Sequence, residues 1–324
     1  MLGRVARAVG CALLAPPLAE VGFSRRGFPG HDSPAARGLE AIPQSVVCGF
    51  EWGMEAHDLH EARQRVETVD AALRGFAYEG TAMAFTVRDA LPTGGSGWTR
   101  ALMDGPARPH TLLAYIGIGF AMARLPRRLW KGVLPDLTDN PHHPTMSWLA
   151  VDGYGFDRAY FDTARWVHRA QTPRPYPWLG APHYFHRAFD QGVGRALWFI
   201  HGARPEAVGD AVLDFAEERR PDLWSGVGLA AAFAGGADPE GLGRLLGAAG
   251  GLAPHAAQGA VFAAKARVLA GTVPGHTEVA MRALTGMDCA RAAALADEHE
   301  VEPGDHGGVP AYEVWRAGVR AHFS

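Results

Sequence analysis

The chain is organised around one stretch, which is repeated in looser form along its length: Phe189-Asp190-Gln191-Gly192-Val193-Gly194-Arg195-Ala196-Leu197-Trp198-Phe199. Aligning the copies on their first glycine gives six positions: Gly80, Gly117, Gly153, Gly192, Gly226 and Gly259. Successive positions differ by 37, 36, 39, 34 and 33 residues. A period in the mid-thirties is typical of one helical hairpin per repeat. We therefore predict an all-α fold, an array of about six helical hairpins that forms a tetratricopeptide-like solenoid or a closed α/α ring.

A small residue follows most of these glycines at helical spacing. Alanine lies four residues later in every copy except the third, where Asp157 follows Gly153. Residues four apart share one face of an α-helix, so a strip of Gly and Ala lets a second helix approach closely. We expect the repeat glycines to lie inside helices at close crossings. The alternative is that a chain with 41 glycines produces such spacings by chance.

Composition is that of an ordinary soluble globular chain. Of 324 residues, 48% are hydrophobic and 20% are charged, which excludes extensive disorder. The formal net charge of -3 gives no electrostatic basis for binding nucleic acid or an anionic membrane. We expect neither partner.

The cysteines and the N-terminus indicate a cytoplasmic chain. Cys11, Cys48 and Cys289 have no close pair, so neither a disulfide framework nor a metal knuckle is indicated. Residues 1–23 superficially resemble a short signal peptide, but Pro16 and Pro17 interrupt the apolar run. No other apolar run reaches the length of a membrane span.

Two regions are expected: an N-terminal cap segment over residues 1–45, and a single α-helical repeat domain over 46–324. Helical spacing predicts helices over residues 35–47, 64–91, 111–125 and 148–167, and a loop over 92–97 ends the second. Pro205 and Pro239 each occupy a first turn, with Asp238 as an N-cap. Each opens the second helix of a hairpin whose first helix carries a repeat glycine.

The chain resembles an actinobacterial family catalogued as domain of unknown function 1702. The resemblance runs from about Pro16 to the C-terminus and rests on blocks 35–40, 76–84, 151–156, 189–199, 222–231 and 312–316. Such proteins are similar to open reading frames beside enediyne polyketide synthases, where they are thought to help mature a linear polyene into the enediyne core. The resemblance implies a pathway in antibiotic natural-product biosynthesis and carries no reaction over to particular residues.

A row of polar residues precedes the repeat glycines. Equivalent positions of successive repeats face one surface, and here they carry Glu79, Asp152, Gln191 and Gln258, with Asp190 beside them. Carboxylates crowded into an apolar concavity acquire raised pKa values and act as general acids or bases. We therefore nominate Glu79, Asp152 and Asp190 as catalytic. The alternative is that these groups satisfy loop amides or neighbouring helix ends.

Other residues near the repeat cores are nominated for substrate binding. Aromatic side chains would line a slot for a flat polyene, although core packing also explains them. Arg195 would hold a carboxylate or a phosphate, or pair with Asp190. His110 and His255 would shuttle protons or cap helices. The nominated binding set is Tyr78, His110, Tyr154, Gln191, Arg195, Trp198, Trp224 and Gln258.

No cofactor or metal is expected. The glycine doublets Gly153/Gly155 and Gly192/Gly194 lack the third glycine of a nucleotide loop. The histidine pairs His57/His60 and His183/His186 have the spacing of a shared helix face, but no further ligand completes a metal site.

Together these features predict an accessory protein of enediyne biosynthesis that binds an apolar polyene or polyketide-derived small molecule. It would convert this ligand by cofactor-independent acid/base chemistry, as a cyclase or isomerase. The alternative is a non-catalytic helical-repeat scaffold that holds polyketide synthase and tailoring enzymes together. A closed apolar cavity favours the first function and an open polar groove the second.

Overall fold

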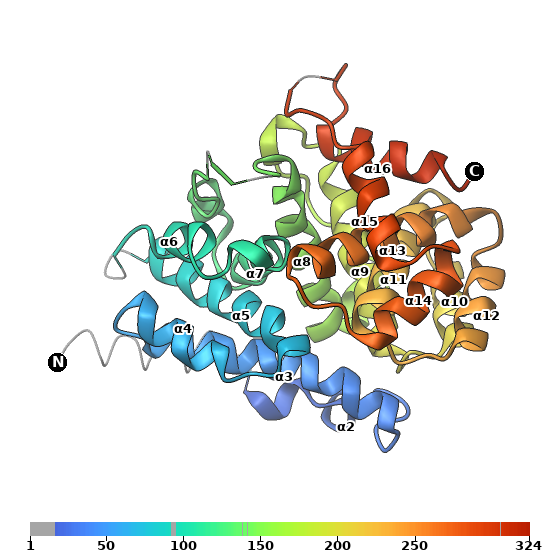
Figure 1. Ribbon diagram of the computed structural model, residues 1–324, viewed down its shortest axis with the longest axis horizontal. Helices are drawn as coiled ribbons and strands as arrows, with labels where there is room; N and C mark the ends of the chain where they lie inside the picture. The colour runs from blue at the N-terminus through green and yellow to red at the C-terminus, as the bar shows by residue number, and fades with distance from the viewer. Residues whose placement is uncertain (1–16, 92–94, 138, 141, 305) are drawn as a thin grey trace. The chain divides into compact units, whose positions relative to one another are not determined.

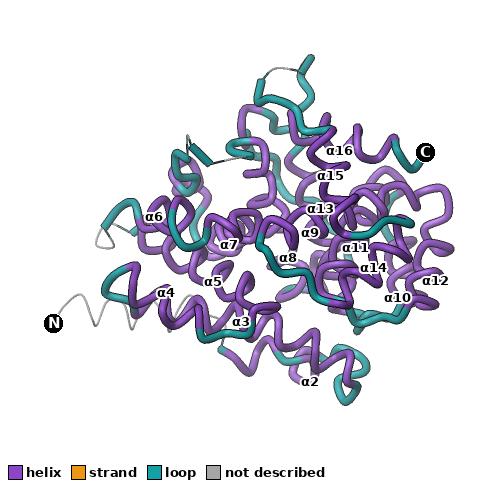
Figure 2. Tube along the Cα trace, viewed as in Figure 1, coloured by secondary structure: helices purple, strands orange, loops and turns teal. Residues whose placement is uncertain are grey.

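The computed structural model describes residues 17–91, 95–137, 139–140, 142–304 and 306–324. Helices alternate with loops (Figures 1 and 2), and no β-strand occurs within these ranges. An isolated antiparallel bridge joins His306 and Val309. The all-α prediction is confirmed. Cys11 and residues 92–94 of the predicted loop lie outside the described residues.

The chain divides into two compact units. The first combines the segment ending at Arg26 with Glu40–Tyr154, and the second combines Gly27–Leu39 with Gly155–Ser324. The chain passes from one unit to the other at three points: after Arg26, where α2 (Phe23–Arg26) ends, and within the helices α3 (Pro34–Glu55) and α8 (Trp148–Phe161). The expected border at residue 45 therefore lies inside α3. That residues 46–324 act as one repeat domain stays a prediction.

The helices named here follow chain order. Those up to α8 are η1 (Leu18–Val21), α2 (Phe23–Arg26), α3, α4 (Leu59–Glu67), α5 (Ala71–Ala90), α6 (Trp98–Asp104), η2 (Arg108–His110), α7 (Thr111–Arg124), η3 (Arg127–Gly132), η4 (Thr145–Ser147) and α8. The later ones are η5 (Ala164–His168, a π-helical turn), η6 (Trp178–Gly180), α9 (Phe185–Ile200), α10 (Pro205–Leu213), η7 (Glu217–Arg219), α11 (Arg220–Ala234), α12 (Pro239–Ala249), η8 (Gly250–Leu252), α13 (Ala253–Leu269), α14 (Gly275–Thr285), α15 (Cys289–Glu298) and α16 (Ala311–Ala321).

Aspartate N-caps set several helix starts. The Asp238 carboxylate accepts a hydrogen bond from the Gly241 amide at 2.7 Å, so its predicted role at the start of α12 is confirmed.

The prediction of one helix over residues 64–91 is wrong. Asp70 accepts from the Ala72 amide at 2.9 Å and begins a new helix, because an N-cap satisfies amides that a continuous helix would already have paired.

The repeat glycines lie inside helices where two backbones meet. A Cβ added at Gly117 would lie 2.0 Å from the Glu79 carbonyl oxygen, and one at Gly226 would lie 1.9 Å from that of Gln191. The same relation holds for Gly80 with Val46 (1.9 Å), Gly153 with Ile116 (2.3 Å) and Gly259 with Ser225 (1.9 Å). Only hydrogen fits at such distances, so the predicted close crossings are confirmed for Gly80, Gly117, Gly226 and Gly259. Gly192 lies buried within α9.

A second glycine or small position makes each crossing reciprocal. Two residues after the repeat glycine, Gly194 approaches the Leu223 carbonyl oxygen, and its added Cβ would lie 2.0 Å away. Further pairs of this kind are Gly49 with Ala77, Gly119 with Ala150, Gly155 with Phe189 and Gly228 with Ala256. Each helix thus offers a bare Cα to its neighbour, a geometry that brings Cα–H groups against carbonyl oxygens.

Within the second unit the helices form two rows. Helix α11 packs against both α9 and α13, and these helices carry the repeat glycines (Figure 1). Helix α12 likewise packs against both α10 and α14, which are the second helices of the same hairpins. Because the glycine row sits between neighbours on both sides, α11 and α13 have few exposed positions, and polar side chains such as Asp222, Ser225 and Gln258 are buried.

No helix within the described ranges has both the length and the apolar character needed to cross a membrane. Cys48 and Cys289 are free thiols.

Candidate functional site

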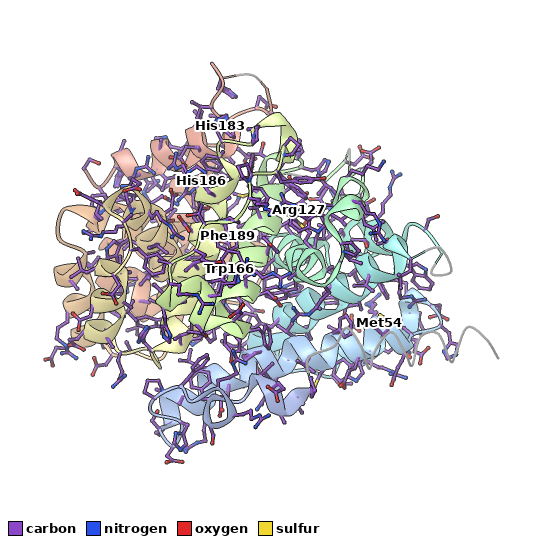
Figure 3. All side chains as sticks on the ribbon, turned by 180° about the vertical axis from the view of Figure 1, so that it is seen from behind. Met54, Arg127, Trp166, His183, His186 and Phe189 are labelled. Atoms are coloured by element: carbon purple, nitrogen blue, oxygen red, sulfur yellow. The ribbon has the colours of Figure 1, made fainter. Side chains whose placement is uncertain are left out.

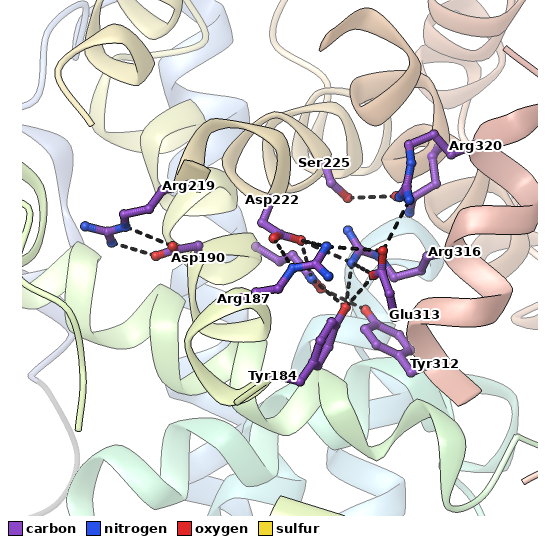
Figure 4. Close-up of polar contacts among 12 residues, drawn as sticks. Tyr184, Arg187, Asp190, Arg219, Asp222, Ser225, Tyr312, Glu313, Arg316 and Arg320 are labelled. Carbon is purple, nitrogen blue, oxygen red and sulfur yellow. Dashed lines mark hydrogen bonds and ion pairs between the residues drawn. The ribbon is translucent and has the colours of Figure 1, made fainter. Parts of the chain in front are cut away.

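A cluster of polar side chains lies inside the second unit, between α9, α11 and α16 (Figure 4). We call it the buried network. Its members are Tyr184, Arg187, Gln191, Asp222, Tyr312, Glu313 and Arg316. Apart from Arg187, which is 35% exposed, every member is buried. Buried charges are costly unless they are paired and hydrogen-bonded, so the pairing decides what this cluster can do.

The Tyr184 hydroxyl is the centre of the network. It donates to Glu313 Oε2 at 2.7 Å and accepts from Arg316 Nη1 at 2.7 Å and from Gln191 Nε2 at 3.2 Å. Burial raises the pKa of Tyr184 well above its usual value, with a further contribution from Glu313 that Arg316 opposes. The phenol therefore stays protonated and acts as a hydrogen-bond donor.

Two carboxylates share the arginines. Asp222 accepts from Arg187 Nε at 2.8 Å and from Arg316 Nη1 at 3.2 Å, and Gln191 Nε2 donates to it at 2.9 Å. Glu313 accepts from Arg316 Nη1 at 2.6 Å and from Arg187 Nη2 at 3.1 Å. Burial alone would raise the pKa of Glu313, but the nearby arginines outweigh it and lower the pKa to about 2.

Helix α16 supplies much of this geometry. Glu313, Arg316 and Arg320 are spaced by three and four residues, which places them on one helix face. On another side of the helix, Trp315 is fully buried and its indole Nε1 donates to the Ala296 carbonyl at 2.7 Å. That bond ties α16 to α15 and fixes the rotation that turns the charged face inward.

The low pKa of Glu313 predicts a loss of stability in acid. The folded-state pKa of about 2 lies below the ordinary 4.5, so the contribution is complete above pH 4.5 and is lost as pH falls toward 2. We expect Glu313 to contribute about 2 kcal/mol less at pH 3 than at pH 5. Urea unfolding of wild type and Glu313→Gln at both pH values measures this difference. Equal pH dependence in the two proteins would contradict it.

Beside the network lie two partly exposed groups, Arg320 and His255. Arg320 Nη2 donates to Glu313 Oε1 at 3.2 Å, so Glu313 is held between Arg320 and Arg316. Burial lowers the pKa of His255 to about 4, helped by the positive charges of Arg320 and Arg316. His255 is therefore neutral at pH 7. Among the described residues none forms a hydrogen bond with His255 Nδ1, Arg316 Nη2 or Arg320 Nη1, all of which are buried atoms.

Asp190, nominated as catalytic, lies in a separate ion pair. Arg219 Nε and Nη2 bind its two oxygens at 2.9 and 2.6 Å, and Arg219 Nη1 also donates to the Ala170 carbonyl at 2.5 Å. Burial raises the pKa of Asp190 to about 6, against the lowering effect of Arg219. The bidentate contact joins the Asp190 carboxylate to η7, and through Arg219 to the turn at Ala170. The catalytic role nominated for Asp190 stays a prediction.

The other nominated residues of the second unit are buried but scattered. Gln191 alone joins the network, where its side-chain oxygen accepts from Tyr312 at 3.1 Å. The Arg195 guanidinium lies over the Phe156 ring at 5.0 Å from the centroid. Trp198 Nε1 donates to the Gly235 carbonyl at 2.8 Å. The remaining two are Gln258, which accepts from Ser225 at 3.5 Å, and the buried Trp224.

The nominated residues of the first unit are Tyr78, Glu79, His110, Asp152 and Tyr154. Tyr78 stacks on His110, with ring centroids 5.2 Å apart. Tyr154 makes an edge contact with Trp130, and Glu79 and Asp152 are buried in α5 and α8. That Glu79, Asp152 and Asp190 converge on one catalytic site stays a prediction.

Over residues 5–323 the sequence matches the family described as "Protein of unknown function (DUF1702)". The chain belongs to this family. No curated protein and no solved structure matches the chain.

The sequence analysis missed most of the buried network, including Tyr184, Asp222, Glu313 and Arg316. These residues lie outside the register of the repeat glycines, and the Tyr184 to Glu313 bond spans 129 residues of sequence. A signal was present in α16, where charged residues at helical spacing occupy one face and Trp315 and Val319 are apolar. The same pattern is found in helices that expose their charged face to solvent and in helices that bury it. Only the packing of α16 in the folded chain distinguishes these two cases.

Neither predicted histidine pair is part of the hydrogen-bonded network, although His186 lies close enough for Asp222 and Arg187 to affect its pKa. His183 and His186 lie near the start of α9 (Figure 3). Further along α9, the Phe189 ring packs against Trp166, with ring centroids 5.1 Å apart. His57 pairs with Glu61 at 3.0 Å. In the part of the chain that the structure describes, no group of three or more His, Cys, Asp or Glu side chains is placed to hold a metal ion.

Proposed function

We propose that this chain is an accessory enzyme of enediyne polyketide maturation, which binds an apolar polyene intermediate and moves protons on it. The pathway and the polyene follow from the sequence blocks that resemble proteins encoded beside enediyne polyketide synthases. The proton chemistry rests on the buried network and on His255 beside it. The reaction class is an isomerisation or cyclisation that needs no oxidant or reductant, because a proton removed at one carbon returns at another.

His255 is the observation that carries this proposal. It is half-buried in α13 and neutral at pH 7, and no described residue bonds to its Nδ1. A neutral imidazole with a free ring nitrogen is a proton acceptor, and once protonated it is a donor. A histidine with only a structural role would have both ring nitrogens or its packing committed to neighbours.

The arginines and phenols beside His255 would stabilise the charge that proton removal creates. Arg316 and Tyr184 are fixed donors in a site where burial excludes water, and such donors act strongly on developing oxyanions. Asp190 is locked to Arg219, so we assign it a positioning role.

His255→Gln tests the function. Glutamine keeps a polar side chain of similar length but removes the titratable nitrogen, so we expect product formation in the producing pathway to fall by about 100-fold or more. Unfolding free energy should change by less than about 1 kcal/mol, because His255 Nδ1 has no partner to lose. His60→Gln, at an exposed position of α4, is the matched control and should leave both quantities unchanged.

The two readouts distinguish catalysis from scaffolding. A stable His255→Gln protein that still supports full product formation would remove this histidine from the mechanism and favour the scaffold. Loss of product that follows loss of stability would assign His255 a structural role. Mass spectrometry of the purified wild-type protein for a bound polyene gives an independent check of the ligand.

A further inference from the structure

The charges in and beside the buried network do not balance. Three arginines, Arg187, Arg316 and Arg320, face two carboxylates, Asp222 and Glu313. The nearby Asp190 and Arg219 neutralise each other. Burial lowers the pKa of both His186 and His255, so both imidazoles are neutral at pH 7. One positive charge is therefore left over in a largely buried cluster, where an uncompensated charge is costly.

Two of the arginines also carry N–H donors that have no hydrogen-bond acceptor among the described residues. Arg316 is 1% exposed, yet its Nη2 has no hydrogen-bond partner among the described residues, and neither has Arg320 Nη1. Arg316 Nη1 donates to Glu313 Oε2 and Arg320 Nη2 donates to Glu313 Oε1, so the two guanidinium groups flank one carboxylate (Figure 4). Buried donors of this kind are normally satisfied, which indicates that an anion binds Arg316 Nη2 and Arg320 Nη1, the nitrogens that Glu313 does not engage.

We propose that Arg316 and Arg320 bind the terminal carboxylate of a long-chain unsaturated acid, which deepens the proposed function and rests on it. A carboxylate carries one negative charge, the amount left uncompensated, and its two oxygens match two guanidinium N–H donors. A phosphate group carries about -1.5 to -2 at pH 7 and would overcompensate the site. The ligand class is therefore a polyene carboxylic acid, which the site should prefer over a neutral hydrocarbon or an ester.

The exposure of the two arginines gives the site a direction. Arg320 is 19% exposed and Arg316 is 1% exposed, so an anion reaches Arg320 first and ends against Arg316. Helix α13, which carries His255, packs against α16, which carries both arginines, and their positive charges help to lower the pKa of His255. A carboxylate held by the arginines would anchor one end of the polyene beside this imidazole.

The test uses the intact protein and cis-parinaric acid, a conjugated tetraene acid whose fluorescence rises on burial. We expect its Kd at pH 7 to be at least about 10-fold lower than that of its methyl ester, since one charge-assisted pair contributes about that factor. Arg320→Gln should remove the difference between acid and ester. The control is Arg244→Gln on α12, which removes an exposed arginine that also contacts two carboxylates, Glu206 and Glu240, and should leave the difference intact.

A second readout follows His255 by NMR. Its pKa should rise when parinaric acid binds, because the carboxylate offsets the two arginine charges that lower it. Acid and ester that bind equally, or an acid preference that survives Arg320→Gln, would overturn the carboxylate site while leaving proton chemistry on a neutral polyene open. Inorganic phosphate that displaces the acid at equal concentration would overturn the choice of a carboxylate. Failure of both acid and ester to bind would also reject it.

Discussion

Gly226→Ala is expected to destabilise the folded chain by about 3 kcal/mol or more. The added Cβ would lie 1.9 Å from the Gln191 carbonyl oxygen and 2.8 Å from the Arg195 amide nitrogen. Both are backbone atoms of α9, so no side-chain rotation relieves the clash and the two helices must separate. Separation also weakens the reciprocal contact of Gly194 with α11. Denaturant unfolding followed by circular dichroism measures the loss.

Gly243→Ala is the matched control, because it makes the same chemical change inside a helix. Gly243 is exposed in α12, and no atom lies within 4 Å of its added Cβ. Alanine is the better helix former, so this variant should be more stable than wild type by up to about 1 kcal/mol. A Gly226→Ala protein that is as stable as the Gly243→Ala protein would show that the α9/α11 crossing is not tight.

The second large effect is expected at Arg316. Arg316→Met keeps much of the side-chain volume but removes the charge that Glu313 and Asp222 share, and should destabilise the fold by about 3–5 kcal/mol at pH 7. The loss arises because Glu313 loses its nearest cation and Asp222 loses one of its two arginine partners, while both carboxylates stay buried. It should shrink as pH falls, since a protonated Glu313 no longer needs that partner.

A double-mutant cycle separates this effect from lost packing. Arg316→Met combined with Glu313→Gln should be less destabilised than the sum of the two single variants, because the second change removes the stranded charge. Arg244→Met, at an exposed arginine, should change stability by less than about 0.5 kcal/mol. Strict additivity in the cycle would mean that Arg316 and Glu313 do not interact.

Local features of the structure were predictable because they depend on neighbours in sequence. The spacing of Gly80, Gly117, Gly226 and Gly259 predicted tight helix contacts, since only glycine allows two backbones to meet at these distances. Asp238 was predictable as an N-cap for the same local reason. The break at Asp70 was missed because the apolar spacing of residues 64–91 continues across it while the cap interrupts the helix.

The sequence alone also determined family membership, and it marked the row of buried polar residues at α5, α8, α9 and α13, because each of them directly precedes a glycine inside a helix. Only tertiary structure decided their partners. It joined Asp190 to Arg219 and brought Glu313 and Arg316 of the last helix to Tyr184, more than a hundred residues earlier. The periodicity of the sequence does not encode this contact between α16 and Tyr184. A helical charge pattern is the same for a solvated face and a buried one, and how α16 packs decides which it becomes.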